Sequence, residues 1–132
     1  MKKEMTVSFP GNKRVDVHWG NMIAKTDQRK AAGGDESAPQ PFDLFFVSLA
    51  SCAGISALEY CTEHSLPTEG LGVRLIAERP KGERRYTTVR VEVTPPADFP
   101  ADHLAGLLQE ADDCSVKRHI QNPPAFETVL AT

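Results

Sequence analysis

The sequence lacks two features that would indicate a function at once: an excess of basic residues and a long uninterrupted apolar run. Its 132 residues include 15 Lys and Arg against 18 Asp and Glu, a net charge of −3, whereas dedicated nucleic-acid-binding proteins normally carry a basic excess. No stretch approaches 18 consecutive apolar residues, and no apolar signal-peptide segment follows the charged residues 1–5. We therefore expect a cytoplasmic protein that binds neither nucleic acid nor membranes.

Cysteine is scarce, and the spacings typical of metal and phosphate sites are absent. The three cysteines, Cys52, Cys61 and Cys114, are too few and too widely spaced for a secreted disulfide framework. Neither Cys-x-x-Cys nor His-x-x-x-His occurs, and Gly33-Gly34 lacks the strand–turn–helix context of a phosphate-binding loop. These absences predict a protein of a reducing compartment that holds no metal and no organic cofactor.

What is present is the composition of a folded globular protein. Hydrophobic residues make up 40% of the chain and charged residues 25%, both close to the average for globular domains. The length is that of one ordinary domain. We therefore expect residues 1–132 to form a single domain.

The first forty residues have the pattern of short strands followed by a loop. Residues 6–9, 15–19 and 22–26 alternate or run as short strands, with turn signals at 10–12 and 20–21. Residues 27–40 are polar and contain Gly33-Gly34, which predicts a loop of about 14 residues. A loop this long in a small domain is usually functional or packed against a partner.

Residues 41–61 are predicted to form a helix, the most apolar element of the chain. Pro41 suits a first helical position, and Asp43 suits the first turn of a helix. The helix is apolar on nearly every side, and such helices are buried on most sides. A small domain has little room to surround it, so we expect a second chain to cover part of it.

The rest of the chain predicts strands at residues 72–78 and 86–94 around a turn at 80–83, and an amphipathic helix at 100–111. Residues 114–120 either continue that helix or begin another. Residues 126–130 predict a last strand. The order of elements predicts an α+β fold with a mostly antiparallel sheet.

The cysteines are the candidate reactive groups. Cys52 has small neighbours that leave its thiol accessible, whereas Cys61, nine residues later, faces the opposite side of the same helix. Cys114 stands at a predicted helix N-terminus, where the dipole would stabilise a thiolate. Free cysteines are also among the most buried residues. Spacing alone therefore leaves both packing and redox chemistry open.

Several motifs together resemble the OsmC/Ohr family over nearly the whole chain. They are the glycine pair at 33–34, a Pro-x-x-Leu helix start at 41–44 that leads to Ala-x-Cys at 50–52, a Leu-Pro-x-Glu-Gly-Leu turn at 66–71, and Cys-x-Val at 114–116. The resemblance implies an intertwined homodimer with mostly antiparallel sheets around a central Cys-bearing helix. Residues 1–40 would be exchanged with the partner, and residues 41–132 would form the helix–strand core.

The resemblance also implies a thiol-dependent peroxidase that acts on organic hydroperoxides. Cys52 matches the peroxidatic cysteine, whose thiolate attacks the peroxide and becomes a sulfenic acid. Cys114 matches the resolving cysteine, which forms a disulfide with Cys52 that an external dithiol then reduces. No cofactor is implied.

The chain departs from the family at the predicted start of the Cys-bearing helix. Peroxidases of the family have Glu after the helix-starting proline, paired with an Arg from the N-terminal strands, whereas this chain has Phe42 followed by Asp43. Arg14 is our candidate for the cation beside the Cys52 thiolate, with Lys13 and Arg29 as alternatives. Asp43 either takes part in catalysis or caps the helix N-terminus.

Two functions are therefore compatible with the sequence. The first is a peroxidase that uses Cys52 and Cys114. The alternative is a non-enzymatic dimer that senses oxidants or binds a small hydrophobic ligand in an apolar cleft lined by Phe42, Phe45 and Phe46. The missing Glu favours the second function, and the presence of both cysteines favours the first.

Overall fold

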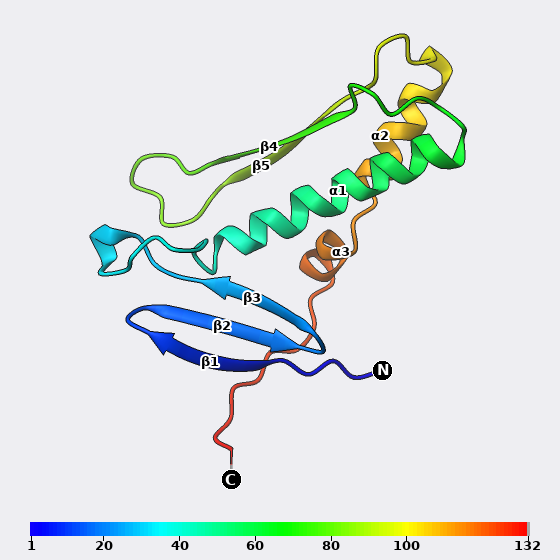
Figure 1. Ribbon diagram of the computed structural model, residues 1–132. Helices are drawn as coiled ribbons and strands as arrows, with labels where there is room; N and C mark the ends of the chain where they lie inside the picture. The colour runs from blue at the N-terminus through cyan, green and yellow to red at the C-terminus, as the bar shows by residue number, and fades with distance from the viewer. Residues whose placement is uncertain (132) are drawn as a thin grey trace. The chain divides into compact units, whose positions relative to one another are not determined.

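Residues 1–131 are described by a computed structural model of the chain, shown in Figure 1. They divide into two compact units, Met1–Val47 and a second unit that begins at Ser48. Helix α1 (Asp43–Glu63) crosses the boundary between them. Helices and antiparallel strands occur together, so the predicted α+β class is confirmed.

The first unit is built on a three-stranded antiparallel sheet. Strands β1 (Thr6–Gly11), β2 (Arg14–Trp19) and β3 (Met22–Thr26) lie in the order β1-β2-β3. The β2–β3 turn has only two residues, and Gly20 there has φ 51°, the left-handed conformation that such a turn favours. The three strands predicted from the sequence are confirmed, and β1 extends two residues further than predicted.

The predicted loop after β3 is present and contains one short 3₁₀ helix, η1 (Lys30–Ala32). Gly33 ends this helix with φ 89°. A Cβ on Gly34 would lie 2.1 Å from the backbone oxygen of Gln28, so only glycine fits there. The glycine pair is therefore required by the path of the loop.

The second unit combines most of α1 with the antiparallel hairpin β4 (Gly72–Glu78) and β5 (Thr88–Thr94). It also contains a 3₁₀ helix η2 (Ala101–His103), α2 (Leu104–Asp112) and α3 (Ser115–Gln121). The helical conformation is interrupted at Asp113 and Cys114, between α2 and α3. The helix predicted at residues 114–120 is therefore separate from α2. Strand β5 begins two residues later than predicted, because Tyr86 lies in the hairpin loop beneath the guanidinium of Arg79.

The core of the second unit lies where α1 meets α2. Its buried members are Ala57, Tyr60, Cys61, Leu107 and Ala111. Partly buried side chains from the hairpin and its flanking loops pack against this cluster: Leu66, Leu71, Val73, Val93 and Phe99. The C-terminal half of α1 is thus fixed to α2 and to the hairpin.

The contact between α1 and α2 is close enough to require glycine. A Cβ on Gly106 would lie 2.3 Å from the phenolic oxygen of Tyr60. That oxygen is also hydrogen-bonded to Nδ1 of His103 at 2.8 Å. Tyr60 therefore sets the distance between the two helices.

The predicted start of α1 and the predicted last strand were both wrong. Helix α1 begins at Asp43 rather than at Pro41, because residues 40–42 form hydrogen-bonded turns that lead into it. Residues 126–130 form no strand within the described chain, and Phe126 and Leu130 are 86% and 93% exposed. Their composition suits a strand, but no described strand pairs with them.

Helix α1 is not fully covered by its own chain. Leu49, Ala53 and Ala57 are buried, whereas Ile55 and Leu58 are exposed. By length and composition alone the helix could cross a membrane, a test that the core helix of a water-soluble protein also passes. That a second chain covers this helix stays a prediction.

The Gly106 contact gives a direct test of the core. We expect Gly106→Ala to lower the free energy of unfolding by about 1–3 kcal/mol, because the added methyl group overpacks the α1–α2 contact. Gly54→Ala is the matched control: its Cβ meets nothing within 4 Å, and the change should raise stability by up to about 1 kcal/mol. Urea denaturation of both variants measures the difference. Equal stabilities would contradict the close contact.

Candidate functional site

Two of the three cysteines come together in the second unit. Cys52 lies in the middle of α1 and is half-buried, and Cys114 is 3% exposed. Both are free thiols, and a hydrogen bond joins the two side chains. Residues 62 positions apart in the sequence therefore share one site.

Cys114 is held in place by the turn between α2 and α3. Helix α2 ends at Asp112, and the backbone N–H of Asp113 donates to the carbonyls of Gln109 and Glu110. Cys114 then has extended backbone angles as the N-cap of α3, and its carbonyl accepts from the N–H of Arg118. The thiol is thereby directed from a fixed turn toward α1.

Ion pairs brace this turn on the side of α3. Lys117 pairs with Asp112, and Arg118 pairs with Asp113. From the sequence, Lys117 and Arg118 could have stabilised a thiolate at Cys114. In the structure their charges are instead paired with the carboxylates that precede Cys114.

The environment of the two thiols shifts their pKa values in opposite directions. The pKa of Cys52 is lowered, mainly because the Cys114 thiol donates a hydrogen bond to its sulfur. The backbone N–H groups of Ser115 and Val116 and the Ser115 hydroxyl lower it further, while burial opposes them. Burial raises the pKa of Cys114, and its hydrogen bond to Cys52 adds to that shift. Of the two thiols, Cys52 therefore ionises more readily, and Cys114 holds its proton to higher pH.

This result corrects the expectation that the N-terminus of the second helix would activate Cys114. The N–H groups of Val116 and Lys117 do lower the pKa of Cys114, as expected, but burial and the hydrogen bond to Cys52 outweigh them. The N–H groups of Ser115 and Val116 also lower the pKa of Cys52, which lies on another helix. Sequence spacing placed the helix terminus correctly, but it could not show how deeply Cys114 is buried.

Cys61 takes no part in this pair. It is completely buried in the core cluster with Tyr60 and Leu107, and burial raises the pKa of its thiol. The predicted division between one packing cysteine and two that face each other agrees with these surroundings.

The other predicted site residues lie in the first unit, where Arg14 and Asp43 have partners. Arg14 forms an ion pair with Asp35 at 2.8 Å and donates from Nε to Ser37 at 3.2 Å. Asp43 accepts a hydrogen bond from the backbone N–H of Gln40 at 3.1 Å, so it caps the start of α1. Lys13 and Arg29 form no ion pair with the described residues. A role for any of these residues beside Cys52 stays a prediction.

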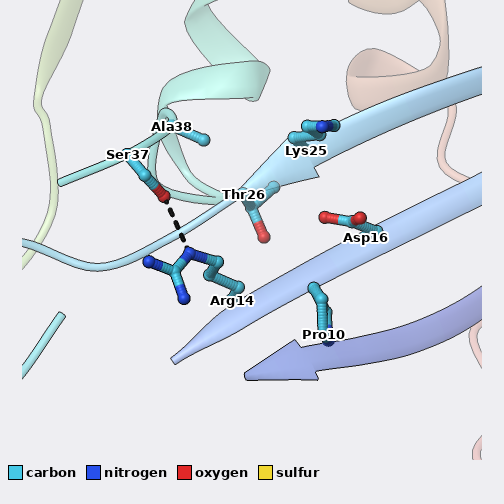
Figure 2. Close-up of a pocket in the computed structure, with 7 residues that line it drawn as sticks. All are labelled: Pro10, Arg14, Asp16, Lys25, Thr26, Ser37 and Ala38. Atoms are coloured by element: carbon cyan, nitrogen blue, oxygen red, sulfur yellow. Dashed lines mark hydrogen bonds between the residues drawn. The ribbon is translucent and has the colours of Figure 1, made fainter. Parts of the chain in front are cut away.

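The first unit also contains a pocket of about 240 Å³, shown in Figure 2. Its lining residues are Pro10, Arg14, Asp16, Lys25, Thr26, Ser37 and Ala38. Side chains of both charges and apolar side chains therefore line this pocket together. Phe42, Phe45 and Phe46 are not among its lining residues; their rings pack on one another with centroids 5.2–5.6 Å apart.

Asp27 anchors the loop that forms one wall of this pocket. The side chain is completely buried and accepts hydrogen bonds from the Ser37 hydroxyl at 2.5 Å, the Ser37 N–H at 3.0 Å and the Gln28 N–H at 2.7 Å. The bonds from Ser37 contribute most to lowering the pKa of Asp27 to about 2. The sequence pattern did not predict this anchor, and its one signal there is an acidic residue directly after a strand. No group of three metal-ligating side chains occurs within the described residues.

The hydrogen bond from Cys114 to Cys52 makes a prediction about reactivity. In Cys114→Ala the pKa of Cys52 should rise, because the main group that lowers it is removed. The rate of alkylation by iodoacetamide at neutral pH should therefore fall. Cys61→Ala is the control and should leave the pH profile of Cys52 unchanged. Identical profiles for the wild type and Cys114→Ala would contradict the assigned hydrogen bond.

The Asp27 anchor makes a prediction about acid stability. A carboxylate with a lowered pKa stabilises the fold fully above its unfolded value near 3.8, and that contribution is lost as the pH falls toward about 2. Asp27→Asn should lower the thermal midpoint by several degrees at pH 7 and flatten its dependence on pH between 4 and 2. Asp16→Asn is the control in the same pocket. A wild-type midpoint that does not change across this range would contradict the prediction.

Comparison with known proteins gives the family of the chain. The sequence pattern of the OsmC-like proteins matches residues 33–129, which include both paired cysteines. No curated protein matches the sequence.

Two solved structures resemble the chain in fold. One, from Psychrobacter arcticus 273-4, bears the provisional name of an osmotic stress induced and detoxification response protein; it is 21% identical, with a TM-score of 0.72, over 89% of this chain and 87% of its own. The other is a hypothetical protein from Aquifex aeolicus VF5, 13% identical, with a TM-score of 0.71, over 93% of this chain and 89% of its own. At these identities the likeness concerns the fold alone. With the family match over most of its length, the chain belongs to the OsmC-like protein family.

Proposed function

We propose that the protein is a thiol-dependent peroxidase that reduces organic hydroperoxides through Cys52 and Cys114. The observation that supports this most is the hydrogen-bonded pair of thiols with opposite pKa shifts. A peroxidase of this kind needs a thiolate to attack and a nearby protonated thiol to resolve. Membership of the OsmC-like family, whose members include stress-response proteins, agrees with this chemistry.

The proposed reaction has three steps. The Cys52 thiolate attacks the distal oxygen of the hydroperoxide, the O–O bond breaks, and an alkoxide leaves that takes a proton to become the alcohol. The resulting Cys52 sulfenic acid condenses with the Cys114 thiol, forming a disulfide and releasing water. An external dithiol then reduces this disulfide by exchange and is itself oxidised.

The surroundings of Cys52 supply part of what a cation would supply in this reaction. The Cys114 thiol, two backbone N–H groups and the Ser115 hydroxyl all donate toward the sulfur. Donors that lie in place before the reaction stabilise a negative charge without reorganisation. Arg14, our candidate for a cation beside Cys52, would add to these donors.

We also propose that the protein works as a homodimer in a reducing compartment. Support comes from α1, which leaves Ile55 and Leu58 half-exposed, and from α2, which leaves Leu104 and Leu108 exposed. A second copy over these side chains would remove the apolar surface from water. The exchange of residues 1–40 between copies stays part of this proposal.

The alternative function is that of an oxidant sensor or of a dimer that binds a small hydrophobic ligand. The observation that favours it is Phe42, which stands where peroxidases of the family have Glu and is 55% exposed in a cluster with two more rings. A slow reaction of Cys52 with peroxide would favour this alternative over a peroxidase.

The experiment is to add one equivalent of an organic hydroperoxide, such as cumene hydroperoxide, to the reduced protein and to count free thiols over time. We expect two thiols to be lost within seconds to minutes and mass spectrometry to find a Cys52–Cys114 disulfide. Dithiothreitol should restore both thiols, and the cycle should consume peroxide.

Single variants assign the roles. Cys52→Ser should abolish peroxide consumption, and Cys114→Ser should leave a Cys52 sulfenic acid that dimedone traps. Cys61→Ala should consume peroxide at the wild-type rate, because Cys61 lies in the core. Three persistent thiols after minutes of exposure would refute the peroxidase and leave the alternative.

A further inference from the structure

Two opposite charges face each other across strands β2 and β3 without forming an ion pair. Asp16 and Lys25 are directly opposite in the antiparallel register, so their side chains lie on the same face of the sheet. In the same register across β4 and β5, the longer Arg74 and Glu92 meet at 3.0 Å. Within the described residues, Asp16 and Lys25 form neither an ion pair nor a side-chain hydrogen bond, so both of their charges are uncompensated.

Both of these side chains line the pocket of about 240 Å³ in the first unit (Figure 2). Every other residue that lines it also belongs to the first unit, so the pocket is complete within that unit. Pockets that take drug-sized molecules usually measure roughly 300–1,000 Å³. This pocket is smaller, so it fits a molecule of few non-hydrogen atoms.

The Thr26 side chain adds a hydrogen-bond acceptor to the pocket. Thr26 is only 4% exposed, and its hydroxyl donates to the backbone carbonyl of Val15 at 2.6 Å. Because the hydroxyl proton is committed to that bond, the oxygen can only accept from a molecule in the pocket. Figure 2 shows the Asp16 carboxylate and the Thr26 hydroxyl turned toward the same space. This side of the pocket therefore suits a cationic group with several N–H donors.

Lys25 is the cation that is left to bind an anionic group. The other cation of the pocket, Arg14, is balanced by Asp35 at 2.8 Å and donates from Nε to Ser37. Ser37 is itself held by two hydrogen bonds to the completely buried Asp27 carboxylate. This wall is therefore in place before any molecule binds, which lowers the cost of binding.

We propose that this pocket binds a small zwitterion, namely a free α-amino acid with a short apolar side chain. Its ammonium group donates to the Asp16 carboxylate and to the Thr26 oxygen, and its carboxylate pairs with Lys25. The apolar side chain lies against Pro10 and Ala38, the uncharged part of the lining. Such a molecule compensates both free charges of the pocket at once.

Other classes of small molecule fit the lining less well than a zwitterion does. A simple anion would face the unpaired Asp16 carboxylate, and a simple cation would face Lys25 and Arg14. A purely apolar molecule would remove charged groups from water without giving them partners, which is costly. A metal ion would find one carboxylate, and no group of three metal-ligating side chains occurs within the described residues.

The test compares three probes of similar shape by chemical-shift titration of the isotope-labelled full chain. L-valine carries both charges, isovalerate lacks the ammonium group, and isobutylamine lacks the carboxylate. We expect L-valine to shift the amide signals of Asp16, Lys25 and Thr26 with a dissociation constant on the order of 1 mM. Each analogue should bind at least roughly tenfold more weakly, because it leaves one charge of the pocket without a partner.

Two variants assign the charges. Asp16→Asn should weaken L-valine binding roughly tenfold but leave isovalerate binding unchanged or tighter, because isovalerate has no ammonium group. Lys25→Gln should weaken L-valine binding by a similar factor but leave isobutylamine binding unchanged or tighter, because isobutylamine has no carboxylate. A variant that failed to fold would instead lose all three probes alike.

Glu92→Gln and Arg74→Gln are the matched controls. They remove the same charges from a directly opposite pair on the β4–β5 hairpin, so both should bind L-valine as the wild type does. Isovalerate that binds the wild type as tightly as L-valine would assign the pocket to simple anions and overturn the proposal. Wild-type affinity for L-valine in both Asp16→Asn and Lys25→Gln would also overturn it. So would an L-valine titration to about 100 mM that shifts no signal of the lining residues.

Discussion

The close contact between α1 and α2 is the constraint on which the thiol pair depends. Gly106 lets Tyr60 approach the backbone of α2, and Tyr60 is bonded to His103 at the start of that helix. From His103 the chain runs 11 residues to Cys114, and along α1 it is eight residues from Tyr60 back to Cys52. At about 1.5 Å per helical residue, the nine residues of α2 span about 14 Å, close to the roughly 12 Å from Tyr60 to Cys52 along α1. Because Tyr60 fixes the start of α2 against α1, the residue that follows α2, Cys114, lies beside α1 near Cys52.

The electrostatics of the pair follow from where this return places each sulfur. Cys114 is more deeply buried than Cys52, so the ionised form of Cys114 is disfavoured by loss of hydration. Cys52 sits where the Cys114 thiol and the first N–H groups of α3 converge, which favours its ionised form. The thiol that is harder to ionise therefore donates the hydrogen bond that lowers the pKa of the other. The same proton donor is the group that would resolve a sulfenic acid, so a disulfide would remove the activating bond.

Local patterns predicted the elements well where local forces decide them. Strand β4 matches its predicted range, and the glycine pair at 33–34 marks a real loop. The prediction failed for residues 126–130, because a strand needs a neighbour that periodicity cannot supply. The Cys52–Cys114 partnership came from resemblance rather than spacing, since residues 62 positions apart meet only through the fold. The hydrogen bonds between Asp27 and Ser37 could not be predicted either, because a loop of irregular path brings these two residues together.

Whole-chain composition says least about how charge is distributed over the surface. A net charge of −3 argues against a dedicated nucleic-acid-binding protein, but it does not describe local charge. The exposed loop of the β4–β5 hairpin carries Arg79, Lys81, Arg84 and Arg85 against Glu83 alone. Apolar surface is non-directional, so the exposed side chains of α1 and α2 can hold a second copy without deciding how it lies.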